Sequence, residues 1–471
     1  MITLHPEEKV PLYEQLYEAL AADIRSGTLL PGKPLPGRRT MAAQLGVSTN
    51  TVDTAYQMLA AEGLAEPRPR SGFFVQETGG MLHTRTARSA SAPASINTQG
   101  KISDILYDLS TGSIDTSLFP ARSWGRIQKE LMYQRPELLQ RGEMQGDANL
   151  RAGIADYLSE YRGVDCTPEQ IVVGAGIEYL LGCLAHLFAG STAAIENPGY
   201  GRTRAVLENS GIPCVPVDID RSGLPADALE HSGANLCYIT PSHHFPTGVT
   251  MPAPRRAQLL AWAAEKPGRY ILEDDYDSEF RFDTRPLPSL QGMAGPDGPV
   301  VYLTTFSKSL APGMRIACMV LPYSLLAQYR RDFAVYANTV SRYEQQTLCA
   351  FMEKGCFTRH IARMRLAYKR RMEDFAGQLR GEFGPRLKLK GEHSGLHFLL
   401  TLPGAGGEEV MVQAAAAQGV RLRGLSEYYM ARPENCQPDT VVAGYAGLDA
   451  KEIPNVCAAL GKAWKSNVLS L

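Results

Sequence analysis

The chain has 471 residues, 44% hydrophobic and 21% charged, with a formal net charge of −1 at pH 7. This length exceeds what one compact core normally supports, so the sequence predicts two or three domains of an ordinary globular protein. No apolar run reaches the roughly 18–20 residues of a membrane span, and no signal peptide is evident. We therefore expect a cytoplasmic protein without a membrane partner, whose nine scattered cysteines are free thiols.

Composition divides the chain into three regions. Residues 1–75 are compact and periodic, and residues 76–104, rich in Ser, Thr, Ala and Gly, are predicted to be a flexible linker. In residues 105–471, apolar runs alternate with helical stretches, which predicts an α/β domain with a mostly parallel sheet covered on both faces. The runs are QIVVG, TAAIE, CVPVDI, NLCYIT, YILED, VVYLTTF and IACMVLP. From about residue 345 the pattern predicts a smaller α+β C-terminal subdomain.

The N-terminal region predicts a helix-turn-helix. A first buried stripe is expected at Leu12, Leu16, Leu20 and Ile24. The stretch LPGRRTMAAQLGVSTNTVDTAYQMLAAEGL then predicts two helices joined by a tight turn at Gly46. The second of these helices would bury Val52, Ala55, Tyr56 and Leu59. Its N-terminal end is thereby left exposed.

That exposed end is the candidate DNA-reading surface. Helix-turn-helix proteins place the first residues of the second helix against base edges. These residues are Ser48, Thr49, Asn50 and Thr51, and Ser48 is suited to cap the first turn. The following EPRPRSGFFV predicts a wing with Gly72 at its tip. The candidate phosphate contacts are Arg38, Arg39, Arg68 and Arg70.

Charge alone does not decide whether this region binds DNA. Residues 1–75 hold seven Lys/Arg and eight Asp/Glu, a net of 7 − 8 = −1. Phosphate contacts need local rather than net charge, and the arginines cluster before the helix pair and in the wing. A small helical domain that binds nothing is the alternative interpretation.

Residues 10–75 resemble the winged helix-turn-helix of GntR-type bacterial regulators. The resemblance implies double-stranded operator DNA as partner, with Arg39 on a phosphate, Thr51 in the recognition helix and Gly72 in the wing. Gly37 and Thr49 depart from the family pattern, which has a serine and commonly an arginine there. The operator sequence is therefore expected to differ from the family's commonest ones.

The stretch TTFSKSLAPGMR, residues 304–315, surrounds Lys308 with small hydroxyls and an arginine. A lysine amine can form a Schiff base with an aldehyde only when part of it is deprotonated, and burial or a neighbouring cation lowers its pKa. Thr305, Ser307 and Arg315 would supply donors for a phosphate. Pyridoxal phosphate (PLP) is the cofactor that combines an aldehyde with a phosphate. A solvated loop with ordinary charges is the alternative.

Three upstream segments carry further groups that suit PLP. In VVGAGIEYLL, a helix opens after Gly176, and backbone N–H groups at a helix start bind phosphate. In ENPGYGRTR, Tyr200 could stack on a flat heterocycle. YILEDDYDSEF places five acids within residues 273–279, which is costly at the end of an apolar strand unless a cation lies there. A pyridinium nitrogen is one such cation, and a divalent metal is the alternative.

These segments, in this order, resemble fold-type I aminotransferases, and specifically the aminotransferase-like domain of the MocR subfamily of GntR regulators. The match covers about residues 106–465 and includes LFPARSW, ENPGYGRTR, TPSHHFPTG, EDDYDSEF, FSKSLAPGMRIACMVLP and SGLHFLL. It implies Lys308 as the Schiff-base lysine and Asp274, or the adjacent Asp275, as the partner of the pyridine nitrogen. The other roles implied are Tyr276 on the ring hydroxyl, Tyr200 stacked on the ring, and Arg315, Thr305 and the backbone at Ala175 and Gly176 on the phosphate.

Several positions depart from the resemblance. Gly447 stands where aminotransferases carry the arginine that grips the α-carboxylate of an amino acid, a loss of on the order of 2–4 kcal/mol of binding. Arg202 matches a ligand-binding position of a GABA-responsive member. Further candidates for the missing clamp are Arg421 and Arg423. The remaining departures are Phe245, Ile177 and Arg141. Each replaces a residue that aminotransferases or many relatives carry, and each weakens the case for a competent transaminase.

The leading hypothesis is a PLP-dependent, DNA-binding transcriptional regulator that senses an effector at Lys308. The effector would be an amino acid, an amine or PLP itself. The resemblance implies a homodimer, arranged head-to-tail. The alternative is a PLP-dependent aminotransferase that carries a DNA-binding module. No metal site is expected.

Overall fold

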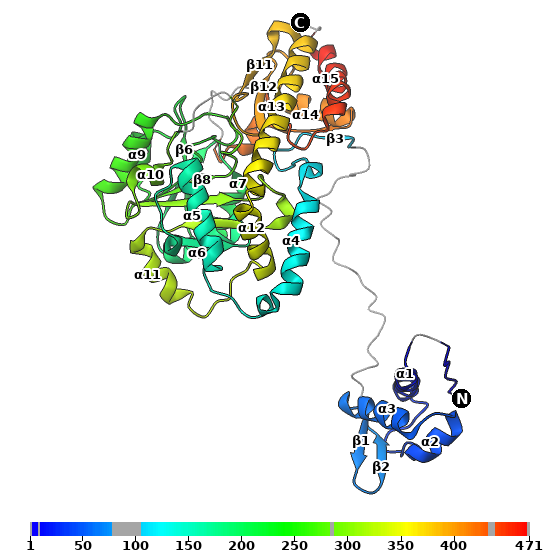
Figure 1. Cartoon of the computed structure of the whole chain (residues 1–471). Helices are drawn as coiled ribbons and strands as arrows, with labels where there is room; N and C mark the ends of the chain where they lie inside the picture. The colour runs from blue at the N-terminus through cyan, green and yellow to red at the C-terminus, as the bar shows by residue number, and fades with distance from the viewer. Residues whose placement is uncertain (1, 8–9, 78–104, 283–286, 432–438, 469–471) are drawn as a thin grey trace. The chain divides into compact units, whose positions relative to one another are not determined.

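The computed structural model describes residues 2–7, 10–77, 105–282, 287–431 and 439–468 (Figure 1). It divides into two compact units, Met1–Lys101 and Ile102–Leu471. The linker predicted at 76–104 lies almost wholly outside the described residues. Among the described helices, none is long and apolar enough to cross a membrane.

The N-terminal unit is a winged helix-turn-helix. Its elements are α1 (Leu12–Arg25), α2 (Arg38–Leu45), α3 (Thr49–Ala61), β1 (Ala65–Arg68) and β2 (Gly72–Val75). The predicted stripes form its core, except that Leu12 is only half-buried. The two strands pair antiparallel from Ala65 opposite Val75 to Arg68 opposite Gly72. Gly72 therefore begins the second strand of the wing, and the tip consists of residues 69–71.

Local chemistry explains the turn between α2 and α3. Gly46 ends α2 with φ of 66°, a left-handed conformation that glycine adopts without steric cost. Ser48 caps α3, because its side chain accepts a hydrogen bond from the Thr51 N–H at 3.0 Å. Tyr56, buried in the core, donates its hydroxyl hydrogen to the Pro36 carbonyl at 2.8 Å. These contacts fix the start of α3 with its first turn exposed.

The C-terminal unit is built on a seven-stranded sheet of order β4-β10-β9-β8-β7-β5-β6. All seven predicted apolar runs are strands of this sheet. Their bounds are β4 (Ile171–Gly174), β5 (Ala193–Asn197), β6 (Cys214–Asp218), β7 (Leu236–Ile239), β8 (Tyr270–Asp275), β9 (Val300–Thr305) and β10 (Ala317–Val320). β10 runs antiparallel to β4 and β9, whereas the pairs among β5 to β9 are parallel.

Helices cover both faces of this sheet. Along β9, Val301 and Leu303 pack into one cluster with α6 and α11, whereas Tyr302 between them packs into another with α5 and α12. This alternation is the period-two pattern of a strand buried on both sides. The covering helices are α4 (Ala121–Gln134), α5 (Ala148–Arg162), α6 (Ile177–Leu187), α7 (Gly201–Asn209), α8 (Ala226–His231), α9 (Ala253–Glu265), α10 (Leu290–Ala294), α11 (Tyr323–Asp332) and α12 (Arg342–Glu353).

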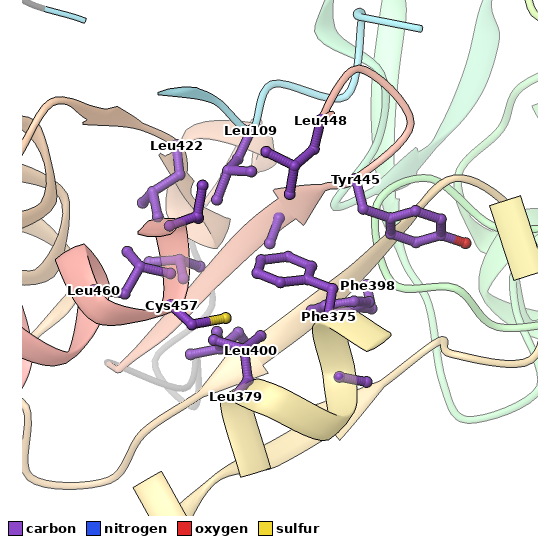
Figure 2. Packing of buried hydrophobic residues seen from close by; sticks show 14 of the residues in the cluster. Leu109, Phe375, Leu379, Phe398, Leu400, Leu422, Tyr445, Leu448, Cys457 and Leu460 are labelled. Atoms are coloured by element: carbon purple, nitrogen blue, oxygen red, sulfur yellow. The ribbon is translucent and has the colours of Figure 1, made fainter. Parts of the chain in front are cut away.

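A second, four-stranded sheet of order β11-β12-β15-β14 forms the smaller part of this unit. Its strands are β11 (Lys388–Lys390), β12 (His397–Thr401), β14 (Arg423–Gly424) and β15 (Thr440–Gly444), and a separate pair joins β3 (Tyr107–Asp108) to β13 (Val420–Arg421). The helices are α13 (Cys356–Phe383), α14 (Glu408–Ala417) and α15 (Ile453–Val468). Phe375 of α13 packs on Phe398 of the sheet in one apolar core that also includes Leu460 of α15 (Figure 2).

The cap of α3 gives a first prediction. Replacing Ser48 by Ala removes the acceptor for the Thr51 N–H and is expected to destabilise the helix start by about 1 kcal/mol. Amide hydrogen exchange of the full chain would then be faster in the first turn of α3. Thr49→Ala, an exposed neighbour that does not cap the helix, is the matched control. Equal exchange in both variants would contradict the prediction.

Candidate cofactor site and DNA-binding surface

The predicted cofactor residues meet at one edge of the seven-stranded sheet. β4, β5, β7, β8 and β9 end at this edge, and the antiparallel β10 begins there, since Ala317 pairs with both Gly174 and Thr305. In open α/β sheets, ligands bind outside the carboxyl ends of the strands. Tyr200, Asp274 and Lys308 follow or end β5, β8 and β9 respectively. The fold therefore brings together groups that lie far apart in the sequence.

Lys308 lies just beyond β9 with its amine held by backbone carbonyls. Its Nζ donates to the Thr111 carbonyl at 2.6 Å and to the Gly112 carbonyl at 3.2 Å. Burial lowers the pKa of Lys308 to about 8, while the charge of Asp277 acts in the opposite direction. Burial, rather than a neighbouring cation, is thus the physical cause of a partly neutral amine. An amine with this pKa is suited to react with an aldehyde near neutral pH.

The acids at the end of β8 divide by their partners. Glu273 lies 4.0 Å from Arg256, Asp277 is hydrogen-bonded to His243 at 2.9 Å, and Glu279 accepts from the Tyr157 hydroxyl at 3.1 Å. The three carboxylates are all buried. Glu273 has an arginine nearby, whereas Asp277 and Glu279 have a histidine and a tyrosine hydroxyl as hydrogen-bond partners within the protein.

Asp275 is neutralised by a buried arginine. Arg162 Nε lies 2.5 Å from Asp275 Oδ2, and the Tyr302 hydroxyl donates to the same oxygen at 2.5 Å. Burial alone would raise the pKa of Asp275, but the charge of Arg162 holds it below its ordinary value. No motif in the sequence indicates this pair, because Arg162 ends a helix more than a hundred residues earlier.

Asp274 has a different environment. Its Oδ2 accepts a hydrogen bond from the Tyr238 hydroxyl, whereas its buried Oδ1 has no hydrogen-bond partner among the described residues. Burial raises the pKa of Asp274 to about 7, and the nearby charges of Asp275 and Asp277 act in the same direction. Both adjacent acids have a buried Oδ1 without a hydrogen-bond partner among the described residues, but Asp275 is paired with Arg162, whereas Asp274 has no ion pair with a described residue. Asp274 is therefore the one whose charge an external cation would compensate.

The predicted phosphate anchors surround the start of α6. Arg315, in a left-handed conformation with φ of 51°, donates to the Ala175 carbonyl at 3.3 Å. A Cβ on Gly176 would lie 2.2 Å from Arg315 Nη2, so glycine lets the backbone approach the guanidinium. Thr305 Oγ1 donates to Ser307 Oγ at 2.9 Å. These residues form one cluster of donors.

The backbone N–H groups of Ala175 and Gly176, predicted to bind the phosphate, have other partners in the structure. The Ala175 N–H donates to Thr339 Oγ1 at 3.0 Å, and the Gly176 N–H donates to the Gly174 carbonyl at 2.8 Å. Both donors are therefore already engaged. The N–H groups that have no carbonyl partner within α6 are those of its first turn, beginning at Ile177. These are the backbone donors that remain for an anion.

Aromatic groups line the same edge. The ring of Phe245 makes edge contacts with Tyr200 at 5.3 Å and with Tyr276 at 6.3 Å between centroids. The Tyr276 hydroxyl lies 3.0 Å from His243 Nδ1, which also bonds Asp277. His243 was not predicted from the sequence; its Nδ1 lies within hydrogen-bonding distance of both the Tyr276 hydroxyl and the Asp277 carboxylate.

Gly447 is tightly enclosed by a segment of the N-terminal part of this unit. A Cβ on Gly447 would lie 2.6 Å from Ser113 Cβ, so a larger side chain does not fit there without displacing this segment. The same segment carries Thr111 and Gly112, whose carbonyls hold Lys308. An arginine at position 447 would therefore require the backbone around Ser113 to move.

The other arginines considered as clamps have partners. Arg421 is paired with Asp108, and Arg423 with Glu427 at 3.4 Å. Arg202 lies beside Tyr200 and pairs with Glu178 at 3.2 Å. Arg141, which was not a clamp candidate but a departure from the resemblance, donates to the carbonyls of Val335 and Tyr336. Of these candidates, Arg202 is the one placed next to the predicted cofactor groups.

In the N-terminal unit, the start of α3 and the wing are exposed. Ser48, Thr49 and Asn50 are exposed and Thr51 is half-buried. Arg38 is paired with Asp53, and Arg68 lies 3.1 Å from Glu66. Arg39 and Arg70 make no ion pair with any described residue. These two arginines are therefore the cations most available to DNA phosphates.

Comparison with known proteins accounts for both units. Residues 12–75 match the family described as "Bacterial regulatory proteins, gntR family", and residues 104–460 match "Aminotransferase class I and II". The crystal structure of kynurenine aminotransferase from Pyrococcus horikoshii has a TM-score of 0.68 and 23% identity, covering 77% of this chain and 91% of that chain. The larger unit thus has the fold-type I aminotransferase fold.

Relatives of matching length share both domains. The uncharacterized HTH-type transcriptional regulator YdeL of Bacillus subtilis is 36% identical over 97% of both chains. The probable rhizopine catabolism regulatory protein MocR of Rhizobium meliloti is 33% identical, over 96% of this chain and 93% of its own. The HTH-type pyridoxine biosynthesis transcriptional regulator PdxR of Corynebacterium glutamicum is 32% identical over 91% of both.

The fold and its site thus define a DNA-binding transcriptional regulator with an aminotransferase-like domain. The chain belongs to the gntR family of bacterial regulatory proteins, in the MocR-type branch.

The buried pair at the end of β8 gives a second prediction. Arg162→Met leaves Asp275 buried without its cation and is expected to lower the free energy of unfolding by roughly 3–5 kcal/mol. Urea unfolding followed by tryptophan fluorescence reports on the larger unit, because Trp124, Trp262 and Trp464 all lie there.

The control for this experiment is an exposed ion pair. Arg204→Met breaks the exposed pair with Glu208 and should cost less than about 1 kcal/mol. Adding Asp275→Asn to Arg162→Met should restore part of the loss, since the uncompensated charge is then removed. A loss in Arg162→Met no larger than that in Arg204→Met would contradict the buried pair's role.

Proposed function

We propose that this regulator binds PLP through Lys308 and that occupancy of the site controls its binding to operator DNA. The observation that carries the proposal is Asp274: a buried carboxylate at a strand end, with one oxygen unpartnered among the described residues, near a lysine whose pKa is about 8. A protonated pyridine nitrogen is the cation that fits beside it. The N–H groups of the first turn of α6, from Ile177, together with the Arg315 guanidinium beside Gly176 would form the matching cradle for a phosphate.

The protein groups would divide the work as follows. PLP supplies an aldehyde that condenses reversibly with primary amines. Lys308 supplies the amine, Asp274 keeps a proton on the ring nitrogen, and Tyr276 offers its hydroxyl to the ring. Arg315, with Thr305 and Ser307, would bind the phosphate. Tyr200, at the end of β5, would cover the ring.

The surroundings of Gly447 restrict which class of effector the site can bind. Because Ser113 lies against this glycine, no arginine clamp for an α-carboxylate can be provided at this position. This observation disfavours transaminase chemistry on standard amino acids and favours an effector held differently. Arg202 is the candidate for an acidic effector, since it lies beside Tyr200.

The second candidate is PLP as the signal itself. A PLP sensor needs no amino-acid clamp, which agrees with Gly447. The similarity to PdxR, whose name refers to pyridoxine biosynthesis, supports the same interpretation. Binding of operator DNA titrated with PLP alone separates the two: a change in affinity favours PLP as signal, and no change favours an added effector.

Either signal must bind one arrangement of the protein better than another, or DNA affinity does not shift. We propose that the two arrangements belong to a homodimer, head-to-tail, in which the winged helix of one chain works with the larger unit of its partner. The start of α3 and the wing would contact the operator.

The cofactor site gives a third prediction. Lys308→Ala is expected to abolish PLP binding that resists dialysis, and Asp274→Asn to weaken it roughly 10- to 100-fold, the value of one charged hydrogen bond. In the wild type, the rate of attachment should rise as pH increases through about 8, because the neutral amine reacts.

Absorbance of the bound cofactor after dialysis measures retention in the two variants, and absorbance followed over time at several pH values measures the rate of attachment. Lys451→Ala, an exposed lysine on the surface, is the control and should behave as the wild type. Retention of PLP by Lys308→Ala at the wild-type level, or a rate that does not change with pH, would contradict the assignment.

The DNA-binding surface gives a fourth prediction. Arg39→Ala is expected to weaken binding to all DNA sequences alike and to reduce the slope of log K against log salt concentration by about 1, as for one lost phosphate contact. Arg25→Ala is the control, because Arg25 is already paired with Glu62 on the outer side of the helices. An unchanged salt slope for Arg39→Ala would refute this phosphate contact.

A further inference from the structure

One carboxylate lies inside the predicted phosphate cradle. Glu178, in the first turn of α6, places Oε2 2.7 Å from Arg315 Nη2 and Oε1 3.2 Å from Arg202 Nη1. It therefore joins the arginine that would bind the cofactor phosphate to the arginine considered for an effector. Burial alone would raise the pKa of Glu178, but the hydrogen bond from Arg315 holds it below the ordinary value. The carboxylate is thus an anion at neutral pH.

In this arrangement, part of the hydrogen-bonding capacity of Arg315 is already used. Its Nη2 donates to Glu178 and also to the Ala175 carbonyl, so both hydrogens of that nitrogen have acceptors. The backbone of Gly176 closes the same side of the guanidinium. A phosphate at Arg315 must either take over the place of Glu178 or bind next to it. The first loses an ion pair, and the second sets two anions side by side.

We propose that Glu178 is an internal anion that competes with the phosphate of PLP for Arg315 and thereby keeps loading of the cofactor reversible. This inference rests on the proposed PLP site. The competition is with the phosphate, because Glu178 contacts the anchor Arg315. The charge of Glu178 also contributes to the raised pKa of Asp274, and PLP and pyridoxal would share that effect, so a comparison of the two isolates the phosphate. When a phosphate binds Arg315 in place of Glu178, the carboxylate still has Arg202 as its partner. Binding of the phosphate therefore affects Arg202, the arginine beside Tyr200.

A direct test uses the full-length protein and two probes that differ only in the phosphate. Glu178→Gln keeps the size of the side chain and removes its charge. The variant is expected to bind PLP on the order of tenfold more tightly than the wild type, as the loss of one nearby like charge implies. Binding of pyridoxal, which lacks the phosphate, should change far less than binding of PLP. Absorbance titration at constant pH and salt gives both dissociation constants.

A second measurement does not need the aldehyde. Inorganic phosphate should protect the Glu178→Gln protein against thermal unfolding at lower concentration than it protects the wild type. The matched control is Glu208→Gln, which removes a carboxylate paired with Arg204 at 3.0 Å on the neighbouring helix α7. This control should leave PLP, pyridoxal and phosphate binding as in the wild type.

The outcomes separate this inference from the cofactor proposal. If the wild type binds PLP but Glu178→Gln binds it no more tightly, the competition is refuted and the cofactor site stands. If pyridoxal binding tightens as much as PLP binding, the effect is not on the phosphate and the inference is again refuted. If neither the wild type nor Glu178→Gln binds PLP, the cofactor proposal itself fails.

Discussion

Burying five carboxylates at and beyond the end of one strand is the constraint on which the larger unit depends. Moving an unpaired ion out of water costs several kcal/mol even after relaxation, so each acid needs a partner. Arg162 reaches Asp275 from the end of α5, and His243 reaches Asp277 from the loop after β7. The partners come from separate helices and loops, and these contacts join the elements around the strand ends.

The same constraint makes the site selective. An acid whose charge is already compensated has little to offer a ligand, whereas Asp274 has a hydroxyl on one oxygen and no described partner on the other. Its raised pKa and the lowered pKa of Lys308 have one cause, burial, acting on groups of opposite charge. A ligand with both a basic ring nitrogen and an aldehyde would offset the cost of burying the Asp274 carboxylate and the cost of burying the Lys308 amine. This pairing of demands is the reason why we propose PLP rather than a divalent metal.

The two units put charge to different uses. In the larger unit, opposite charges are paired inside the protein, and Glu178 shows that even a predicted anion site is partly filled by the chain's own carboxylate. In the N-terminal unit, acids compensate Arg38 and Arg68 and leave Arg39 and Arg70 outside any described ion pair. A weakly acidic domain can therefore still present a local cationic surface, which is what a phosphate backbone requires.

The sequence by itself determined the winged helix-turn-helix and the strands of the central sheet, because periodicity and turn chemistry are local, whereas for the smaller subdomain it predicted only the α+β class. The seven apolar runs are the seven strands of the central sheet, and Ser48 caps the helix predicted to follow it. The sequence also located the lysine and the acid cluster through their motifs. Only the tertiary structure decided which of the two adjacent aspartates is paired with a cation, since Arg162 lies 113 residues from the Asp275 that it neutralises. It likewise brought Glu178 to an arginine 137 residues away. Ion-pair partners are chosen by folding, and no spacing in the chain encodes that choice.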